Sequence, residues 1–463
     1  MAAAAVAVQA DGAVSARGGV SRQRGGGTTP RRPPNELSPA EAGGQCEAPL
    51  LTTLLHTANT SERVLGLAAA HAQAGRLNPT HVAAALHALG RVAAARRVPG
   101  ASRAQGKGRV APQGGAPWVM TDIRLAQLLQ LAVQPDAAWT AAGHQPCSAT
   151  DLVSSLRGVV ALRWQSSPQW RAGWEALACD RARQGAFPPR ELSGSVWCYA
   201  TLGLTPGGQW AAACEALLQA CAGELKPQEL AAVCWSFGAR SQPPGWDTVT
   251  ALQRAVTKAA EARDGAPTAL GPREAANVLW GVARWDLQPG GAAQGQWAGH
   301  VIGCVAHRLV EGATPQEVAN TVWALAKLCG PFKAKGESHI PAHFWPHFDA
   351  ASLRAVPSMN ARNLCAVAGS LAAMRWTPSP EWKAAFEAQV LVKAHKLCPH
   401  QARTLLGAWR RMAWTPPQEV LAIVGERLAV APPIAVNTPR PPAPMAGKRP
   451  PPPQVSDTLA RAR

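Results

Sequence analysis

A pattern of fifteen residues recurs seven times in this chain, and it restricts the folds that the sequence can adopt. The clearest copies are PPRELSGSVWCYATL, KPQELAAVCWSFGAR, GPREAANVLWGVARW and TPQEVANTVWALAKL, which begin at residues 188, 226, 271 and 314. Looser copies begin at residues 148, 360 and 398. Aligned on their first apolar residue, the copies start 38 to 46 residues apart, at Leu152, Leu192, Leu230, Ala275, Val318, Leu364 and Ala402. A period of this length is typical of a solenoid, in which each unit buries its apolar face against its neighbours.

Each copy has the pattern of a helix followed by a second helix. Five copies carry proline at one aligned position, where the missing N–H costs nothing in a first helical turn: Pro189, Pro227, Pro272, Pro315 and Pro399. Thr314 and Glu317 match the capping box of a helix start. Apolar residues recur at the start position and three, four and seven residues later, which is the helical period. After a turn that contains proline, a tryptophan opens the second helix at Trp170, Trp210, Trp246, Trp297 and Trp382.

The predicted fold is therefore all-α. We expect an α-solenoid of about seven helix–turn–helix repeats of 38–46 residues within residues 119–430, with the first helices lining the concave side by analogy with other helical repeats. A helical leader or capping unit is predicted at 46–94, and a mobile basic loop rich in Gly and Pro at 95–118. Both termini are predicted to be disordered, at 1–45 and in the Pro-rich tail at 431–463.

The second-helix openings read SSPQW, PGGQW, PPGW and PSPEW, beginning at residues 166, 206, 243 and 378. With the first-helix pattern, they resemble the octotricopeptide repeat family of green-algal organelle proteins, whose second helices open with a Pro-Pro-Pro-Glu-Trp-like motif. The resemblance covers residues 148–430. Residues 54–92 resemble the leader that precedes the repeats in this family and in FAST-kinase-like proteins. Many members end in a RAP domain, of which this sequence shows no evident copy.

This resemblance implies sequence-selective binding of single-stranded organelle RNA, which would support the stability, splicing, processing or translation of transcripts. Other organelle RNA-processing proteins are further candidate partners. The charge agrees with a polyanionic ligand, because 46 Lys and Arg residues against 28 Asp and Glu residues give a net charge of +18. A generally basic surface without a nucleic-acid partner is the alternative.

The first 35 residues contain five arginines and one acidic residue, which favours an organelle transit peptide. The chloroplast is the expected address and the mitochondrion the alternative; a disordered basic tail without an address would have the same composition. No stretch is apolar enough to cross a bilayer, so no membrane insertion is expected.

Catalysis is not expected, because the sequence has no phosphate loop, nucleophile elbow, kinase signature or pair of catalytic carboxylates. The eleven cysteines form no C-x-x-C pair, and those within the predicted helices, namely Cys198, Cys214, Cys221, Cys234 and Cys304, are expected to be small core residues. His343 and His347 have a metal-ligand spacing without further ligands. We therefore predict no catalytic residue, no metal and no cofactor.

One face of the first helices is predicted to bind RNA. Counted from the start residue, positions 6 and 8 are mostly small, so neighbouring first helices can approach closely. Positions −2, 2, 5 and 9 lie opposite the core and combine cations, amides and tryptophans, which can neutralise phosphates, bond base edges and stack on bases. The candidate residues are Arg190, Trp197, Gln228, Trp235, Arg273, Asn277, Trp280, Arg284, Gln316, Asn320, Trp323, Lys327, His400, Thr404 and Arg411.

Two alternatives remain open at this point. The tryptophans at position 5 could instead pack between repeats, and the charges could be ordinary solvated groups. The whole solenoid could be a protein–protein scaffold, and a degenerate organelle nuclease is a third, weaker interpretation.

Overall fold

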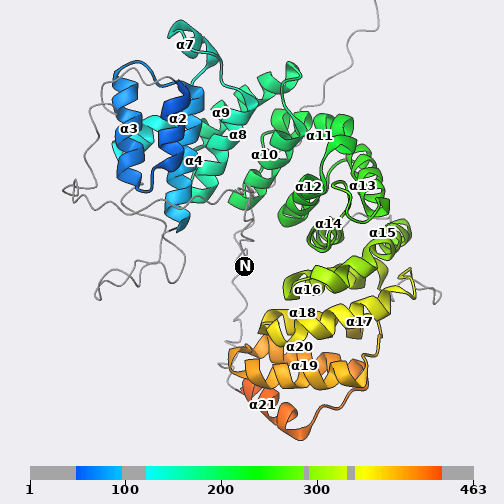
Figure 1. Cartoon of the computed structure of the whole chain (residues 1–463). Helices are drawn as coiled ribbons and strands as arrows, with labels where there is room; N and C mark the ends of the chain where they lie inside the picture. Colours follow the sequence, from blue (N-terminus) through cyan, green and yellow to red (C-terminus); the bar gives the residue numbers. More distant parts are fainter. Residues whose placement is uncertain (1–47, 96–120, 286–290, 331–338, 430–463) are drawn as a thin grey trace, which may run out of the picture.

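The computed structural model describes residues 48–95, 121–285, 291–330 and 339–429, and these residues form an α-solenoid without any strand (Figure 1). The predicted fold class is therefore confirmed for this part of the chain. Residues 1–45 and 431–463, for which disorder is predicted, lie outside the described residues. Almost all of the basic loop predicted at 95–118 does too.

Seven helical hairpins occupy the part of the chain where seven repeats were predicted, as judged from the described residues. The first helices are α8 (Ala149–Leu162), α10 (Pro189–Leu202), α12 (Pro227–Arg240), α14 (Pro272–Arg284), α16 (Pro315–Cys329), α18 (Ala361–Ala373) and α20 (Pro399–Arg411). The second helices are α9 (Pro168–Arg183), α11 (Gly208–Cys221), α13 (Trp246–Glu261), α15 (Gly291–Gly312), α17 (Phe344–Ala355), α19 (Pro380–Lys393) and α21 (Gln418–Ala429).

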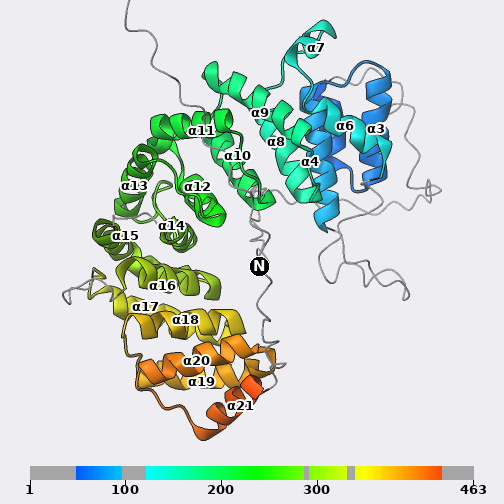
Figure 2. The ribbon, with the colours of Figure 1, turned by 180° about the vertical axis from the view of Figure 1, so that it is seen from behind.

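The hairpins follow one another along an arc. Each first helix packs against the first helix of the next hairpin, and each second helix packs against the next second helix. The first helices lie on the inner side of the arc and the second helices on its outer side, most clearly where α12 and α14 lie inside α13 and α15 (Figure 1; Figure 2 shows the same arc from behind). The expectation that first helices line the concave side is confirmed.

The inner helices begin where their capping residues predict. In α16, the Thr314 hydroxyl accepts a hydrogen bond from the Glu317 N–H, and the Glu317 carboxylate accepts one from the Thr314 N–H at 2.8 Å. Ser148 and Asp151 form the same reciprocal pair at the start of α8. The start position and the positions three, four and seven residues later are buried in all seven inner helices, with Leu406 of α20 half-buried as the exception. This burial is the physical basis of the apolar period in the sequence.

Glycine allows two pairs of inner helices to approach to backbone contact. A Cβ at Gly281 of α14 would lie 2.2 Å from the Cys234 carbonyl oxygen of α12, and a Cβ at Gly238 would lie 2.7 Å from Gly281 Cα. A Cβ at Gly158 of α8 would lie 2.6 Å from the carbonyl carbon of Leu86, which belongs to α4 (Pro79–Ala95) of the leader. The predicted close approach through small residues at positions 6 and 8 is confirmed at these crossings.

The residue immediately before the cap of each inner helix ties the two helices of a repeat together. It is apolar and buried in every repeat: Cys147, Phe187, Leu225, Leu270, Ala313, Met359 and Leu397. In four repeats its carbonyl oxygen accepts a hydrogen bond from the second helix, namely from Arg181 at 2.8 Å, Arg308 at 2.9 Å, Arg354 at 3.3 Å and Gln389 at 2.8 Å. These bonds satisfy a buried carbonyl and fix the angle between the two helices.

The predicted leader is part of the same stack. It contains α2 (Ala48–Thr57), α3 (Ser61–Gln73) and α4 (Pro79–Ala95), and α4 packs closely on α8 as an inner helix would. The short helix α6 (Ile123–Leu131) takes the place of its outer helix, because the Trp170 indole N–H of α9 donates to the Leu129 carbonyl at 2.7 Å. Helix α7 (Asp136–Ala141) then leads into α8. The solenoid therefore starts one layer earlier than the seven repeats.

Candidate nucleic-acid interface

All fifteen candidate residues lie on inner helices, in rows contributed by α10, α12, α14, α16 and α20. Six of them are exposed: Arg190, Gln228, Gln316, Lys327, His400 and Arg411. The other nine are half-buried. The structure thus brings residues that are up to 221 positions apart in the chain (190 to 411) to one side of the arc.

Charge is distributed unequally between the two sides of the arc. The eight inner helices, α4 included, carry eleven Arg or Lys residues and five Asp or Glu residues. The eight outer helices, α6 included, carry eleven Arg or Lys residues and eleven Asp or Glu residues. The excess of positive charge among these helices therefore belongs to the inner helices, which line the concave side, where a polyanion could be held.

The five acidic residues of the inner helices all lie in the first helical turn, and three of them cap their own helix start. The Glu229 carboxylate accepts from the Lys226 N–H at 2.9 Å, and Glu317 and Asp151 cap in the same way. Glu191 is buried 3.9 Å from the Arg157 guanidinium, and burial raises the pKa of its carboxyl group. Since these four carboxylates are engaged with cap groups or buried, they offset little of the positive field along the helix faces.

Three of the candidate tryptophans form a row across neighbouring repeats. The ring centroids of Trp235 and Trp280 are 6.3 Å apart with an interplanar angle of 21°, and those of Trp280 and Trp323 are 6.3 Å apart at 37°. We call these three residues the tryptophan row. Trp197, at the same position of α10, has no ring neighbour among the described residues. Ring contacts of this kind stabilise the seam between inner helices.

Arg284 reinforces the row from the end of α14. Its guanidinium carbon lies 5.1 Å from the Trp280 ring centroid. Its Nε donates to the Gly238 carbonyl at 2.8 Å, and an Nη donates to the Ser241 hydroxyl at 2.9 Å. Trp280 therefore has an indole on either side and a cation above it, which favours the packing alternative for this tryptophan over base stacking.

The amide residues differ between the fourth and fifth repeats. Gln316 Nε2 donates to Asn320 Oδ1 at 2.7 Å, which leaves the Asn320 amino group and the Gln316 carbonyl oxygen available to a ligand. The Asn277 and Arg273 side chains have no hydrogen-bond partner in the described part of the chain. These four side chains can bond base edges or phosphates.

At one end, the inner helices carry position-5 residues that were not among the fifteen candidates, and at the other end the residue type at position 5 changes. His87 of α4 and Arg157 of α8 occupy position 5 of their helices, and a register counted from Pro79 would have found His87. At the other end, position 5 is Gly369 in α18 and Gly407 in α20, so the tryptophan row does not continue. Thr404 donates its hydroxyl to the His400 carbonyl at 2.9 Å, and the Arg411 side chain is exposed.

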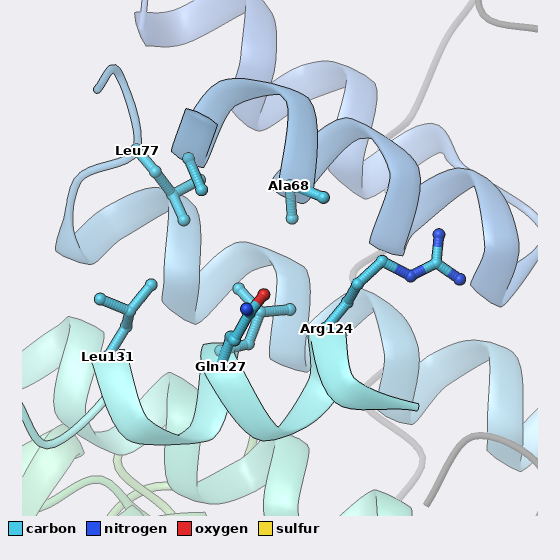
Figure 3. Close-up of a pocket in the computed structure, with 8 residues that line it drawn as sticks. Ala68, Leu77, Arg124, Gln127 and Leu131 are labelled. Carbon is cyan, nitrogen blue, oxygen red and sulfur yellow. The ribbon is translucent and has the colours of Figure 1, made fainter. Parts of the chain in front are cut away.

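Other chemistry finds little support in the described residues. No three His, Cys, Asp or Glu side chains there converge as metal ligands, and no helix there is long and apolar enough to cross a membrane. The pocket between α3 and α6 is lined mostly by alanine and leucine side chains, with Gln127 and Arg124 as its polar members (Figure 3). Arg124 pairs with Glu62 at 2.8 Å. Burial raises the pKa of the Cys198 and Cys234 thiols to about 12, so both stay protonated at neutral pH as core residues.

Comparison with known proteins leaves the family open. No protein-family model matches the chain, and no curated protein matches it.

Proposed function

We propose that this protein binds single-stranded RNA along the concave face of its solenoid and has no catalytic role of its own. The observation that carries the proposal is the excess of cations on the inner helices, beside the balanced charge of the outer helices. Half-buried tryptophans other than Trp280 add stacking surfaces between these cations, and amide side chains add hydrogen-bonding groups. The resemblance to octotricopeptide repeats supports the same function, with sequence-selective binding that assists the stability, splicing, processing or translation of an organelle transcript.

The test is to remove exposed cations from the concave face and to measure binding of a fluorescein-labelled 20-nucleotide RNA of randomised sequence. The inner triple variant is Lys327→Ala, Arg362→Ala, Arg411→Ala, in which the exposed Arg362 occupies position −2 of α18. Because each lost phosphate contact removes about 0.7 from the slope of log K against log salt, we expect the slope to fall by about 2 and binding at low salt to weaken about tenfold or more. Anisotropy titrations at several salt concentrations measure both quantities.

The matched control is Arg183→Ala, Arg254→Ala, Lys258→Ala, which removes the same charge from exposed positions of the outer helices α9 and α13. We expect it to bind RNA as the unaltered protein does. If both triple variants lose affinity equally, RNA binds by net charge alone and the concave face is not the site. If the unaltered protein binds no RNA, the scaffold alternative takes its place.

We further propose that the protein acts in the chloroplast, with the mitochondrion as the alternative, from the Arg-rich and acid-poor start of the sequence. A fluorescent protein fused behind the full-length chain should accumulate in chloroplasts of a green-algal cell. Diffuse cytosolic fluorescence would rule the proposal out.

A further inference from the structure

The tryptophan row ends at Trp323, because the next inner helix, α18, carries only small side chains beside it. Position 5 of α18 is Gly369, where a Cβ would meet only the Thr404 methyl group at 3.5 Å. The residues at positions 2 and 9 of α18 are Ala366 and Ala373. Trp323 is half-buried, and among the described residues Trp280 is its one ring neighbour.

The two ends of the Trp280–Trp323 contact therefore differ. Within the described part of the chain, Trp280 has indole neighbours in both adjacent repeats, whereas Trp323 has one on the α14 side and none on the α18 side. Positions 2, 5 and 9 of α18 are alanine or glycine, so no side chain at these positions of α18 continues the row. A planar group placed there would continue the row.

We propose that a nucleobase of bound RNA stacks on the open face of Trp323, above Gly369. This inference rests on the proposed function and assigns one base-stacking position within it. Asn320 and Lys327 lie one helical turn before and after Trp323 on the same face of α16. The Asn320 amino group, left free by the bond from Gln316, can donate to the edge of the stacked base. The exposed Lys327 ammonium can pair with the adjoining phosphate, and charge complementarity thus favours a nucleotide over an apolar partner.

Filling the space with an indole tests the proposal directly. In Gly369→Trp the new side chain takes the place of the base, so binding of the fluorescein-labelled 20-nucleotide RNA should weaken about 5- to 150-fold, the range expected for one lost base stack. Gly369→Ala adds one methyl group at the same position and should weaken binding far less than Gly369→Trp does, since its Cβ meets only one methyl group at 3.5 Å. Both full-length variants should melt no lower than the unaltered protein in circular dichroism.

A second pair of variants decides the matter if Gly369→Trp fails to fold. Trp323→Leu keeps an apolar side chain against Trp280 but removes the aromatic face, and Trp323→Phe keeps a smaller aromatic face. We expect weaker RNA binding for the leucine variant than for the phenylalanine variant, which retains part of the stacking surface. If Gly369→Trp or Trp323→Leu binds RNA with the affinity of the unaltered protein, the stacking position is wrong. The proposed function is tested separately, by whether the unaltered protein binds RNA.

Discussion

Trp174→Ala is expected to lower the free energy of unfolding by about 3–5 kcal/mol, the usual cost of removing a fully buried tryptophan. Trp174 of α9 has no exposed surface, and its indole N–H donates to the Leu152 carbonyl of α8 at 2.9 Å. Its ring also lies 5.7 Å from Tyr199 and 5.6 Å from Trp210, both in the next repeat. One side chain thus joins both helices of its own repeat to the next one.

Urea unfolding followed by circular dichroism at 222 nm measures the loss. Trp246→Ala is the matched control, because Trp246 opens α13 and is 54% exposed, and we expect a change within about 0.5 kcal/mol. Similar losses for the two variants would contradict the packing role of Trp174. In a solenoid, each repeat is stabilised by the interfaces with its nearest neighbours. The Trp174 variant should therefore weaken the interface between repeats one and two, so that these repeats unfold less cooperatively with the rest of the solenoid.

Gly281→Ala is expected to destabilise the solenoid by about 1–3 kcal/mol, although alanine is the better helix former. The added Cβ would lie 2.2 Å from the Cys234 carbonyl oxygen and 2.8 Å from the Trp235 amide nitrogen. Both atoms belong to the backbone of α12, so the clash is relieved only if α12 and α14 move apart. That movement would also stretch the contact between Trp235 and Trp280 and the bond from Arg284 to Gly238.

Thermal unfolding of Gly281→Ala is best compared with that of Gly425→Ala. Gly425 lies in α21, and a Cβ added there meets nothing within 4 Å. The control should therefore gain up to about 1 kcal/mol from helix propensity alone. If Gly281→Ala is stabilised by the same amount, the inner helices are farther apart than the structure has them.

The sequence alone determined the repeat, the helix starts and the orientation of each inner helix. These properties are local, since a capping box such as Thr314 with Glu317 and a helical period of apolar residues act within one turn or one helix. The same period placed positions −2, 2, 5 and 9 opposite the core, and the burial of the inner helices bears this out. The small residues at positions 6 and 8 also signalled the close crossings at Gly238 and Gly281.

The tertiary structure alone decided how neighbouring repeats meet. The sequence did not decide whether the tryptophans pack between repeats or stack on bases. That role depends on the distance and crossing angle between inner helices that are 38 to 46 residues apart in the chain. That geometry places Trp280 between two indoles and anchors Arg284 on the preceding helix. In the described part of the chain it leaves Trp323 without a ring neighbour on its α18 side. It also joins α4 to the stack across residues 96–120, which the repeat spacing could not show. Such contacts follow from the packing of the whole stack, and no period within one helix encodes them.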